Sequence, residues 1–250
     1  MVNEQEIQKL QERIVREFNS EVTQAFYTEH TKEGLWLSEK ELIDRYFRLP
    51  SKVLDIGCGT GRTTLALRDM GYEVLGVDIT PNMIENAKKI VSARGKEDIQ
   101  YEVGDATNLK LGDNCFDYAL FSNQGWSQIP TKIKRAKALE EVYRVLRPNG
   151  IFIFTVHPMI WFSKRLFFWA WQWFKFYLLK PFGFPTQELE FGDRFFKREN
   201  NGLKYNQSQY IHIPLVSTVE NMVRDVGFEI VWSGEMAGVV SSPHFFVCKK

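Results

Sequence analysis

The sequence predicts an α/β protein whose helices cover both faces of a doubly wound, mostly parallel sheet of seven strands. Three observations lead to this prediction. Short apolar runs alternate with helical stretches as far as Val156, one of these runs ends in a glycine-rich turn, and two later runs can pair as an antiparallel C-terminal hairpin. The length of 250 residues and the 44% hydrophobic content suit one domain, residues 1–250, with a sizeable core.

The composition argues against several classes of protein. A net charge of +1 disfavours an extended nucleic-acid-binding surface, so we expect no nucleic-acid partner. The three cysteines are scattered, which fits neither a disulfide framework nor a metal site, and no clear ligand cluster appears elsewhere. The N-terminus lacks the apolar core of a signal peptide, and the default expectation is a cytoplasmic protein.

Residues 1–50 are predicted to form a helical cap ahead of the sheet. Apolar residues recur there at steps of three or four, which indicates one amphipathic helix or a broken pair of helices. We expect most of this apolar stripe to belong to the core. It consists of Ile7, Leu10, Ile14, Phe18, Val22 and Phe26.

The most informative stretch is the point where the first strand runs into glycines. Lys52–Ile56 is a short apolar run of the kind found in buried parallel strands. Gly57, Gly59 and Gly61 follow it, and they permit backbone angles and a close ligand approach that side chains would forbid. A helix continues over 65–70, and its free N–H groups face the turn. The turn is therefore predicted to cradle a ligand.

Two details of this turn narrow the choice of ligand. Arg62 stands where a dinucleotide-binding fingerprint has its third glycine, which disfavours NAD. Asp55, near the end of the strand, suits a cationic or amine-bearing ligand better than a pyrophosphate. S-adenosylmethionine, which carries both a sulfonium and an ammonium group, fits both details.

The segment Asp55-Ile-Gly57-Cys-Gly59-Thr-Gly61 resembles motif I of the class I S-adenosylmethionine-dependent methyltransferases, an acid followed by Gly-x-Gly-x-Gly. The resemblance covers residues 51–156 firmly and about the last thirty residues loosely. It implies a Rossmann-like fold, S-adenosyl-L-methionine as the cofactor, and roles in binding that cofactor for Asp55 and the three glycines.

A second acid follows the next predicted strand, 72–77. Asp78 lies roughly twenty residues past the glycines, where a carboxylate can accept both hydrogen bonds from a ribose diol. The resemblance implies the same role for Asp78 and places Ile79 against the adenine face. Pro81 then begins a helix whose apolar side is expected in the core.

Two later strand ends complete the expected cofactor site. Asp105 and Ala106 follow the third strand, where the resembled family has an acid near the adenine amine; a simple turn-forming aspartate is the alternative. Asn123 follows the fourth strand, Phe116–Phe121, and is expected near the methionine part of the cofactor. Trp126 either walls the acceptor pocket or packs in the core.

Three further residues are candidates for roles at the active site. In the resembled family the segment before motif I often covers the cofactor, and Tyr27 is the candidate there. His157, at the end of the fifth strand, is the candidate general base for a hydroxyl or carbon acceptor, because histidine titrates near neutrality. His212 competes for that role, and either histidine can be purely structural.

Residues 157–213 are predicted to form an insertion after the fifth strand. From Trp161 to Phe184 the chain carries four of its seven tryptophans, four basic residues and no acidic residue. About twenty residues can span a membrane, but Gln172 and Lys175 in the centre argue against a span. We expect an aromatic lid over the active site. The alternative is peripheral membrane contact through 161–184.

The last part of the chain is predicted to complete the sheet. Asn200-Asn-Gly202 indicates a hairpin turn within the insertion. After it, a helix that ends at Gly227 precedes a strand over Phe228–Trp232, and 243–248 supplies the final strand. The turn Arg147-Pro-Asn-Gly150, before the strand Ile151–Val156, departs by one residue from the form usual in the resembled family.

These features together predict an enzyme that transfers the sulfonium methyl group of S-adenosyl-L-methionine to a small, apolar or aromatic acceptor by in-line displacement. The methylated atom, O, N or C, is not predicted, and neither is the oligomeric state. One alternative is a membrane-surface or scaffold protein that binds the cofactor without turnover. Another, a nicotinamide oxidoreductase, is disfavoured by Asp55 and Arg62.

Overall fold

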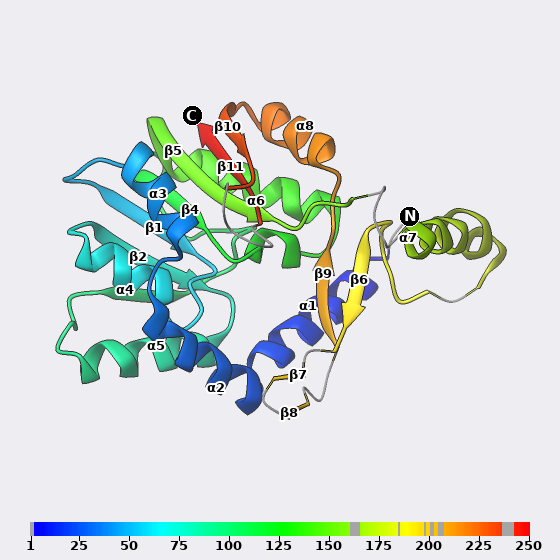
Figure 1. The fold of residues 1–250 in the computed structure, drawn as a ribbon, viewed down its shortest axis with the longest axis horizontal. Coiled ribbons are helices and arrows are strands. Elements are labelled where there is room, and N and C mark those ends of the chain that lie inside the picture. Colours follow the sequence, from blue (N-terminus) through cyan, green and yellow to red (C-terminus); the bar gives the residue numbers. More distant parts are fainter. Residues whose placement is uncertain are drawn as a thin grey trace.

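The computed structural model describes residues 3–160, 166–184, 186–197, 199–200, 203–204, 208–236 and 243–250. Its centre is a seven-stranded sheet with the order β10-β11-β5-β4-β1-β2-β3 (Figure 1). The strands from β1 to β5 pair in parallel, whereas β11 is antiparallel to both β5 and β10. The predicted fold class is therefore confirmed.

The strands lie close to their predicted positions. The largest difference is at β5, which begins at Leu146 because this residue already pairs with Phe116 of β4 before the register shifts. The predicted turn Arg147–Gly150 is thus the irregular start of this strand. The sheet comprises β1 (Lys52–Ile56), β2 (Glu73–Asp78), β3 (Gln100–Val103), β4 (Phe116–Phe121), β5 (Leu146–Val156), β10 (Glu229–Gly234) and β11 (His244–Lys249).

Helices cover both faces of the sheet because alternate strand residues point to opposite faces. Leu54 and Ile56 pack on one face with α6 and α8, while Val53 packs on the other face with α3 and α4. A smaller cluster joins α4 and α5 to Tyr101 of β3. The helices are α3 (Leu37–Tyr46), α4 (Arg62–Asp69), α5 (Pro81–Ala93), α6 (Lys132–Val145) and α8 (Val216–Val226), with the short η2 (Gly125–Gln128) before α6.

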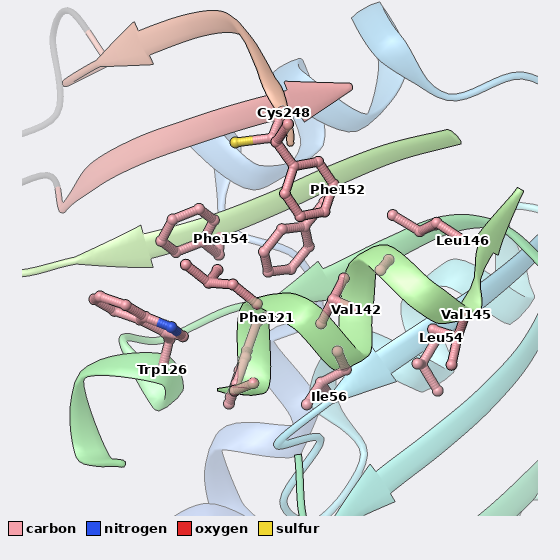
Figure 2. Close-up of a cluster of buried hydrophobic side chains, with 14 of the residues drawn as sticks. Leu54, Ile56, Phe121, Trp126, Val142, Val145, Leu146, Phe152, Phe154 and Cys248 are labelled. Carbon is pink, nitrogen blue, oxygen red and sulfur yellow. The ribbon is translucent and has the colours of Figure 1, made fainter. Parts of the chain in front are cut away.

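The largest apolar cluster lies between β4, β5, β11 and the helices α6 and α8. Figure 2 shows Phe152 and Phe154 of β5 side by side, with Trp126 and Cys248 beside them. The rings of Phe152 and Phe154 are stacked with centroids 4.9 Å apart, and Trp126 is 1% exposed. This packing makes the carboxyl half of the sheet a rigid support for the loops that follow each strand.

The N-terminal segment forms two helices, α1 (Glu4–Phe18) and α2 (Glu21–His30), followed by the short η1 (Thr31–Glu33). Between α1 and α2 the chain breaks at a new cap, where the Ser20 hydroxyl accepts a hydrogen bond from the Thr23 N–H. Of the two predicted forms, the structure has the broken pair. The stripe is less buried than predicted, since only Leu10 among its members is fully buried.

The segment between β5 and α8 stands beside the main sheet (Figure 1). Its aromatic part is helical, and an antiparallel pair, β6–β9, lies between this helical part and α1. A two-residue pair, β7–β8, brackets the predicted Asn200-Asn-Gly202 turn, whose last two residues lie outside the described part of the chain. The elements are α7 (Leu166–Phe174), η3 (Lys175–Leu179), η4 (Lys180–Phe182), β6 (Asp193–Phe196), β7 (Glu199–Asn200), β8 (Leu203–Lys204) and β9 (Gln209–His212).

Within the described residues, no helix has both the length and the apolarity needed to cross a membrane. The rejection of a membrane span on sequence grounds agrees with this finding.

Candidate active site

A cavity lies at the carboxyl ends of β1, β2, β3 and β4, with α1 forming its opposite wall. It holds about 900 Å³ of empty space, with the solvent at its mouth included. In open α/β sheets, ligands bind at this edge of the strands. Of the residues predicted for the cofactor, the structure brings eight together in its lining: Tyr27, Gly57, Gly59, Asp78, Ile79, Asp105, Ala106 and Asn123.

The glycine turn fits a closely bound ligand. Gly57, Gly59 and Gly61 all have positive φ, at 62°, 54° and 91°, which side chains rarely adopt. A Cβ at Gly61 would clash with Tyr101, so this glycine is required by packing. A Cβ at Gly59 would meet no atom within 4 Å and would instead project into open space, while Gly59 itself lines the cavity. The backbone here is therefore open to a cofactor.

Asp78 ends β2 and lines the same cavity. One carboxylate oxygen, Oδ2, accepts a hydrogen bond from the Gly59 N–H at 2.9 Å, and Oδ1 accepts one from the Thr80 N–H at 2.8 Å. Burial raises the pKa of this carboxyl, although the two backbone hydrogen bonds act in the opposite direction. Each oxygen keeps a second lone pair, so the fixed carboxylate can still accept hydrogen bonds from a diol.

Asp105 is tied to the N-terminal helix. Its Oδ1 accepts hydrogen bonds from the N–H and the hydroxyl of Thr107, both at 2.8 Å. The side-chain amide of Gln11, on α1, donates to Oδ2 at 3.1 Å, and Gln11 in turn accepts a hydrogen bond from Lys134 Nζ at 2.8 Å. This chain of contacts holds α1 across the mouth of the sheet.

Asp55 is buried below the cavity and is not among the residues that line it. The hydroxyls of Thr63 and Thr64 donate to its Oδ2 at 2.6 and 2.5 Å, and Oδ1 accepts no hydrogen bond from the described chain. Burial raises the pKa of Asp55 to about 6, against the effect of the threonine hydrogen bonds. The structure thus shows how Asp55 supports the start of α4, and its contact with a cationic ligand stays a prediction.

Tyr27, in α2, and Asn123, just after β4, both line the cavity. The Tyr27 ring packs on Phe18 with centroids 5.8 Å apart, and its carbonyl accepts a hydrogen bond from Thr60 Oγ1 at 2.8 Å. These contacts join α2 to the glycine turn. Asn123 has a left-handed backbone, with φ at 48°, which turns the chain sharply after β4.

Two other candidates lie away from the cavity lining. Trp126 is buried, and its indole N–H donates to the Arg135 carbonyl at 3.1 Å, so of its two predicted roles the structure shows packing. His157 is exposed just after β5 and does not line the cavity. Its role as a base therefore stays a prediction.

The sequence interpretation missed an apolar wall that α1 contributes. Ile14, Val15 and Phe18 line the cavity, whereas the sequence pattern predicts Ile14 and Phe18 in the core. Ile129 and Pro130, after η2, continue this wall. Helical periodicity reveals which face of α1 is apolar, but a core and a ligand cavity are lined by the same residue types, so periodicity alone does not separate them.

A buried polar network supports this wall from the side of β6 and β9. Arg135, on α6, donates to the Ile129 carbonyl at 3.0 Å and to Glu190 at 2.6 Å. Asp193 accepts a hydrogen bond from the Tyr210 hydroxyl at 2.8 Å and lies 2.8 Å from His212 Nδ1. Burial acts to raise the pKa of Asp193, but the hydrogen bond and charge of His212 outweigh it, and the net pKa is lowered.

The same network contains three side chains that are close enough together to hold a metal ion, a cluster that the sequence did not reveal. Glu190, Asp193 and His212 place one ligand atom each within 4.8 Å of the others. Glu190 already neutralises Arg135, and Asp193 is bonded by two side chains and by the N–H groups of Leu189 and Glu190. These contacts account for the cluster as part of the scaffold.

Comparisons with known proteins agree with this geometry. A family profile described as a methyltransferase domain matches residues 54–154. The demethylmenaquinone methyltransferase of Staphylococcus epidermidis is 29% identical over 199 residues, which make up 78% of this chain and 74% of the relative. That of Paenarthrobacter aurescens is 32% identical over 122 residues, 48% of this chain and 45% of the relative. A SAM-dependent methyltransferase structure from Methanosarcina mazei matches with a TM-score of 0.67 and 22% identity, covering 87% of this chain and 98% of the other.

The strand order, the glycine turn and the matched profile define a Rossmann-like enzyme that uses S-adenosyl-L-methionine as its methyl donor. The predicted cofactor and type of enzyme are thereby confirmed. Residues 54–154 match the methyltransferase-domain family, and the chain has the fold of the class I S-adenosylmethionine-dependent methyltransferases.

Proposed function

We propose that this enzyme methylates a small apolar acceptor with an aromatic ring, of the quinone class to which demethylmenaquinone belongs. The observation that supports this proposal is the apolar wall of the cavity, formed by Ile14, Val15 and Phe18 of α1 with Ile129 and Pro130. It faces an edge of the sheet whose polar groups suit the cofactor, so an apolar acceptor can be held between the two. Demethylmenaquinone methyltransferases are among the relatives, and their names support the same class.

Different residues at the polar edge of the cavity are assigned to the ribose, adenine and methionine parts of the cofactor. We assign Asp78 to the ribose diol, since its carboxylate is fixed by two backbone hydrogen bonds and keeps free lone pairs. Ile79 packs on the adenine, and Asp105 with Ala106 receives the adenine amine. Beneath them, the three glycines and Asp55 accommodate the methionine part. Asn123 approaches that part from the end of β4.

The parts of the chain outside the sheet are assigned to the acceptor. Residues 1–50 form a cap, because α1 and Tyr27 complete the cavity opposite the strands. Among the residues that the structure describes, none of the insertion 157–213 lines the cavity. The predicted lid function of this insertion, and a base at His157 or His212, stay predictions.

Bound S-adenosyl-L-methionine supplies a methyl group on a sulfonium sulfur: the acceptor atom forms a bond to the methyl carbon while the carbon–sulfur bond breaks, leaving the electron pair on sulfur. The residues of this chain act mainly by positioning. Asp78 and Asp105 fix one end of the site, and the α1 wall excludes water from the other. A hydroxyl or carbon acceptor also needs a base to remove its proton.

The proposal is tested by supplying methyl-labelled cofactor with reduced demethylmenaquinone and, in parallel, with polar amines and carboxylic acids. Label is expected in the quinol alone. Ile14→Ser is expected to raise KM for the quinol several-fold without weakening S-adenosylhomocysteine binding. Ile7→Ser is the matched control, since Ile7 lies on the same helix and is similarly half-buried but does not line the cavity.

Two results would contradict the proposal. Transfer to a polar acceptor at a higher rate than to the quinol would assign a different substrate class. Tight S-adenosylhomocysteine binding with no transfer to any acceptor tried, in solution or on vesicles, would favour the scaffold alternative.

A further inference from the structure

Residues 166–184 carry exposed apolar side chains at a higher density than the rest of the described chain. Of the sixteen large apolar side chains that are most exposed in the described structure, nine lie between Leu166 and Phe184. Single exposed apolar residues are ordinary on a protein surface, but a contiguous cluster of this kind marks an interaction site. Figure 1 shows α7 at the far end of the molecule from β1, β2 and β3.

The exposed side chains form a stripe along one face. Phe167, Trp171, Phe174, Leu178 and Phe182 follow one another at steps of three or four, and their exposed fractions are 87%, 57%, 40%, 42% and 82%. At this spacing Phe167, Trp171 and Phe174 share a face of α7, and Leu178 in η3 and Phe182 in η4 extend the exposed apolar surface beyond the end of that helix. A surface helix normally turns polar residues to the solvent on such a face, so this face lacks a partner within the described chain.

The opposite face holds the segment in place. Trp169 is 2% exposed and packs with Met159, Ile211 and Ile213. Lys175 forms an ion pair with Glu188 at 2.6 Å, and Lys180 donates to the Glu188 carbonyl at 3.0 Å. The segment is thus anchored to the body of the protein in one orientation, and the apolar stripe points away from it.

The charge of the segment indicates whether the aromatic stripe packs on a second copy of this chain or on an anionic surface. From His157 to Gln187 the sequence contains four basic residues and no acidic one, while the remainder of the chain is net negative. Lys175 is neutralised by Glu188, which leaves the positive charges of Lys164, Arg165 and Lys180, and packing the stripe of one copy on that of another would bring these like charges together. An anionic surface, in contrast, complements the segment.

We propose that residues 166–184 dock this methyltransferase on the surface of an anionic lipid bilayer, with α7 lying in the plane of the interface. Trp171, Trp173 and Tyr177 are exposed there, and these ring types are favoured at the boundary between water and lipid. Lys164 and Arg165 precede the segment in sequence, and basic residues next to an interfacial helix favour anionic lipid. The docking does not rest on the identity of the methyl acceptor.

The test is co-sedimentation of the purified protein with two kinds of vesicle, one of phosphatidylcholine alone and one of equal parts phosphatidylcholine and phosphatidylglycerol. The wild type is expected to bind the anionic vesicles, with a blue shift of tryptophan fluorescence. The double variant Phe167→Ser/Trp171→Ser is expected to lose at least about a hundredfold in affinity, since each ring buried in lipid contributes more than about 1.4 kcal/mol, or a factor of about ten.

The matched control is Leu37→Ser/Ile133→Ser, which removes side chains that are 82% and 81% exposed but lie outside the stripe. It is expected to bind vesicles like the wild type. S-adenosylhomocysteine binding, measured by calorimetry, is expected to be unchanged in both variants, which separates a failure of docking from a failure of the enzyme to fold or to bind its cofactor.

Three outcomes would overturn the proposal. The first is a wild type that binds neither vesicle. The second is equal binding to both vesicles or by both variants. The third is a dimer, seen by analytical ultracentrifugation, that dissociates only in Phe167→Ser/Trp171→Ser while vesicles are ignored, because the stripe would then be an interface between copies of this chain.

Discussion

Asp78 holds the backbone of the site in place, and we propose that the same carboxylate binds the ribose. Its two oxygens hold the Gly59 and Thr80 N–H groups, which fixes the glycine turn relative to the start of the next helix. The same oxygens face a cavity that a ribose would enter. The side chain is therefore oriented before any ligand arrives, which lowers the entropy lost on binding.

Asp78→Ala is expected to weaken S-adenosylhomocysteine binding by roughly 1.5–3 kcal/mol, because charge-assisted hydrogen bonds to the ribose are lost. Isothermal calorimetry measures the effect, and circular dichroism checks that the variant is folded. Asp113→Ala, at an exposed aspartate outside the cavity, is the control. Unchanged affinity in a folded Asp78→Ala protein would refute the ribose assignment.

Asp55 is buried beneath the cavity, and its environment favours the neutral form of its carboxyl group. Its folded pKa of about 6 lies above the ordinary value of 3.8, since burial dominates. Folding therefore binds a proton more tightly, and the contribution of Asp55 to stability is fully present below about pH 4 and is lost as the pH rises through 6.

Asp55→Asn removes this titration. The free energy of unfolding of the wild type, measured relative to that of Asp55→Asn, is expected to fall by about 2.4 kcal/mol between pH 4 and pH 7. Urea unfolding of both proteins across this range gives the comparison. A difference that stays constant with pH would show that Asp55 does not titrate in this window.

At the scale of elements, the cap and the sheet are joined by a buried ion pair. Glu39 of α3 is fully buried, and its two carboxylate oxygens accept hydrogen bonds from Arg62 of α4, both at 2.7 Å. The guanidinium also lies over the Trp36 ring, 4.1 Å from its centroid, and the Ser122 hydroxyl donates to Glu39. Arg62, the residue whose presence in the glycine turn disfavours NAD, thus has a structural role.

Glu39→Gln is expected to destabilise the protein by about 3 kcal/mol, because it leaves the Arg62 charge buried without a counter-charge. Glu41→Gln is the matched control on the same helix, where the exposed pair with Arg45, at 3.6 Å, contributes about 1 kcal/mol or less. Denaturant midpoints provide the measurement. Equal losses in the two variants would mean that the buried pair does not brace α3 against α4.

Local sequence was sufficient to predict the elements of the sheet. The strand Lys52–Ile56 and the glycine turn after it can be predicted from a few neighbouring residues. A short apolar run that ends in glycines is compatible with few structures other than a buried strand and a tight turn. The contacts that close the site are of another kind. Gln11 meets Asp105 and Arg135 meets Glu190 across long stretches of chain, and no local pattern specifies such pairs.

At the scale of the whole molecule, binding of the cofactor is expected to stabilise the fold by mass action. S-adenosylhomocysteine at about 100 times its Kd adds about 2.7 kcal/mol, which corresponds to a rise in Tm of roughly 5–10 °C for a chain of this size. Differential scanning fluorimetry measures this shift. NAD is the comparator and is expected to leave Tm unchanged; a rise with NAD alone would reverse the cofactor preference.

The acceptor could be predicted only as a class because its site is assembled by the whole fold. The apolar wall comes from α1 and from the loop after η2, and α1 also packs against the neighbouring β9 through Leu10 and Tyr210. Sequence showed that both regions are apolar. Which of their side chains face a ligand depends on how the cap and the insertion pack, and that packing is non-local.

The brace between Arg62 and Glu39 also bears on what the smallest viable fragment of this enzyme is. The family match begins at residue 54 and includes Arg62, but Glu39, which neutralises it, lies upstream. A fragment cut to the matched boundaries would leave the Arg62 guanidinium, at the start of α4 beside the glycine turn, without its counter-charge. The matched segment therefore lacks a contact that the whole chain makes, and we expect a fragment of residues 54–154 to be less stable than the whole chain.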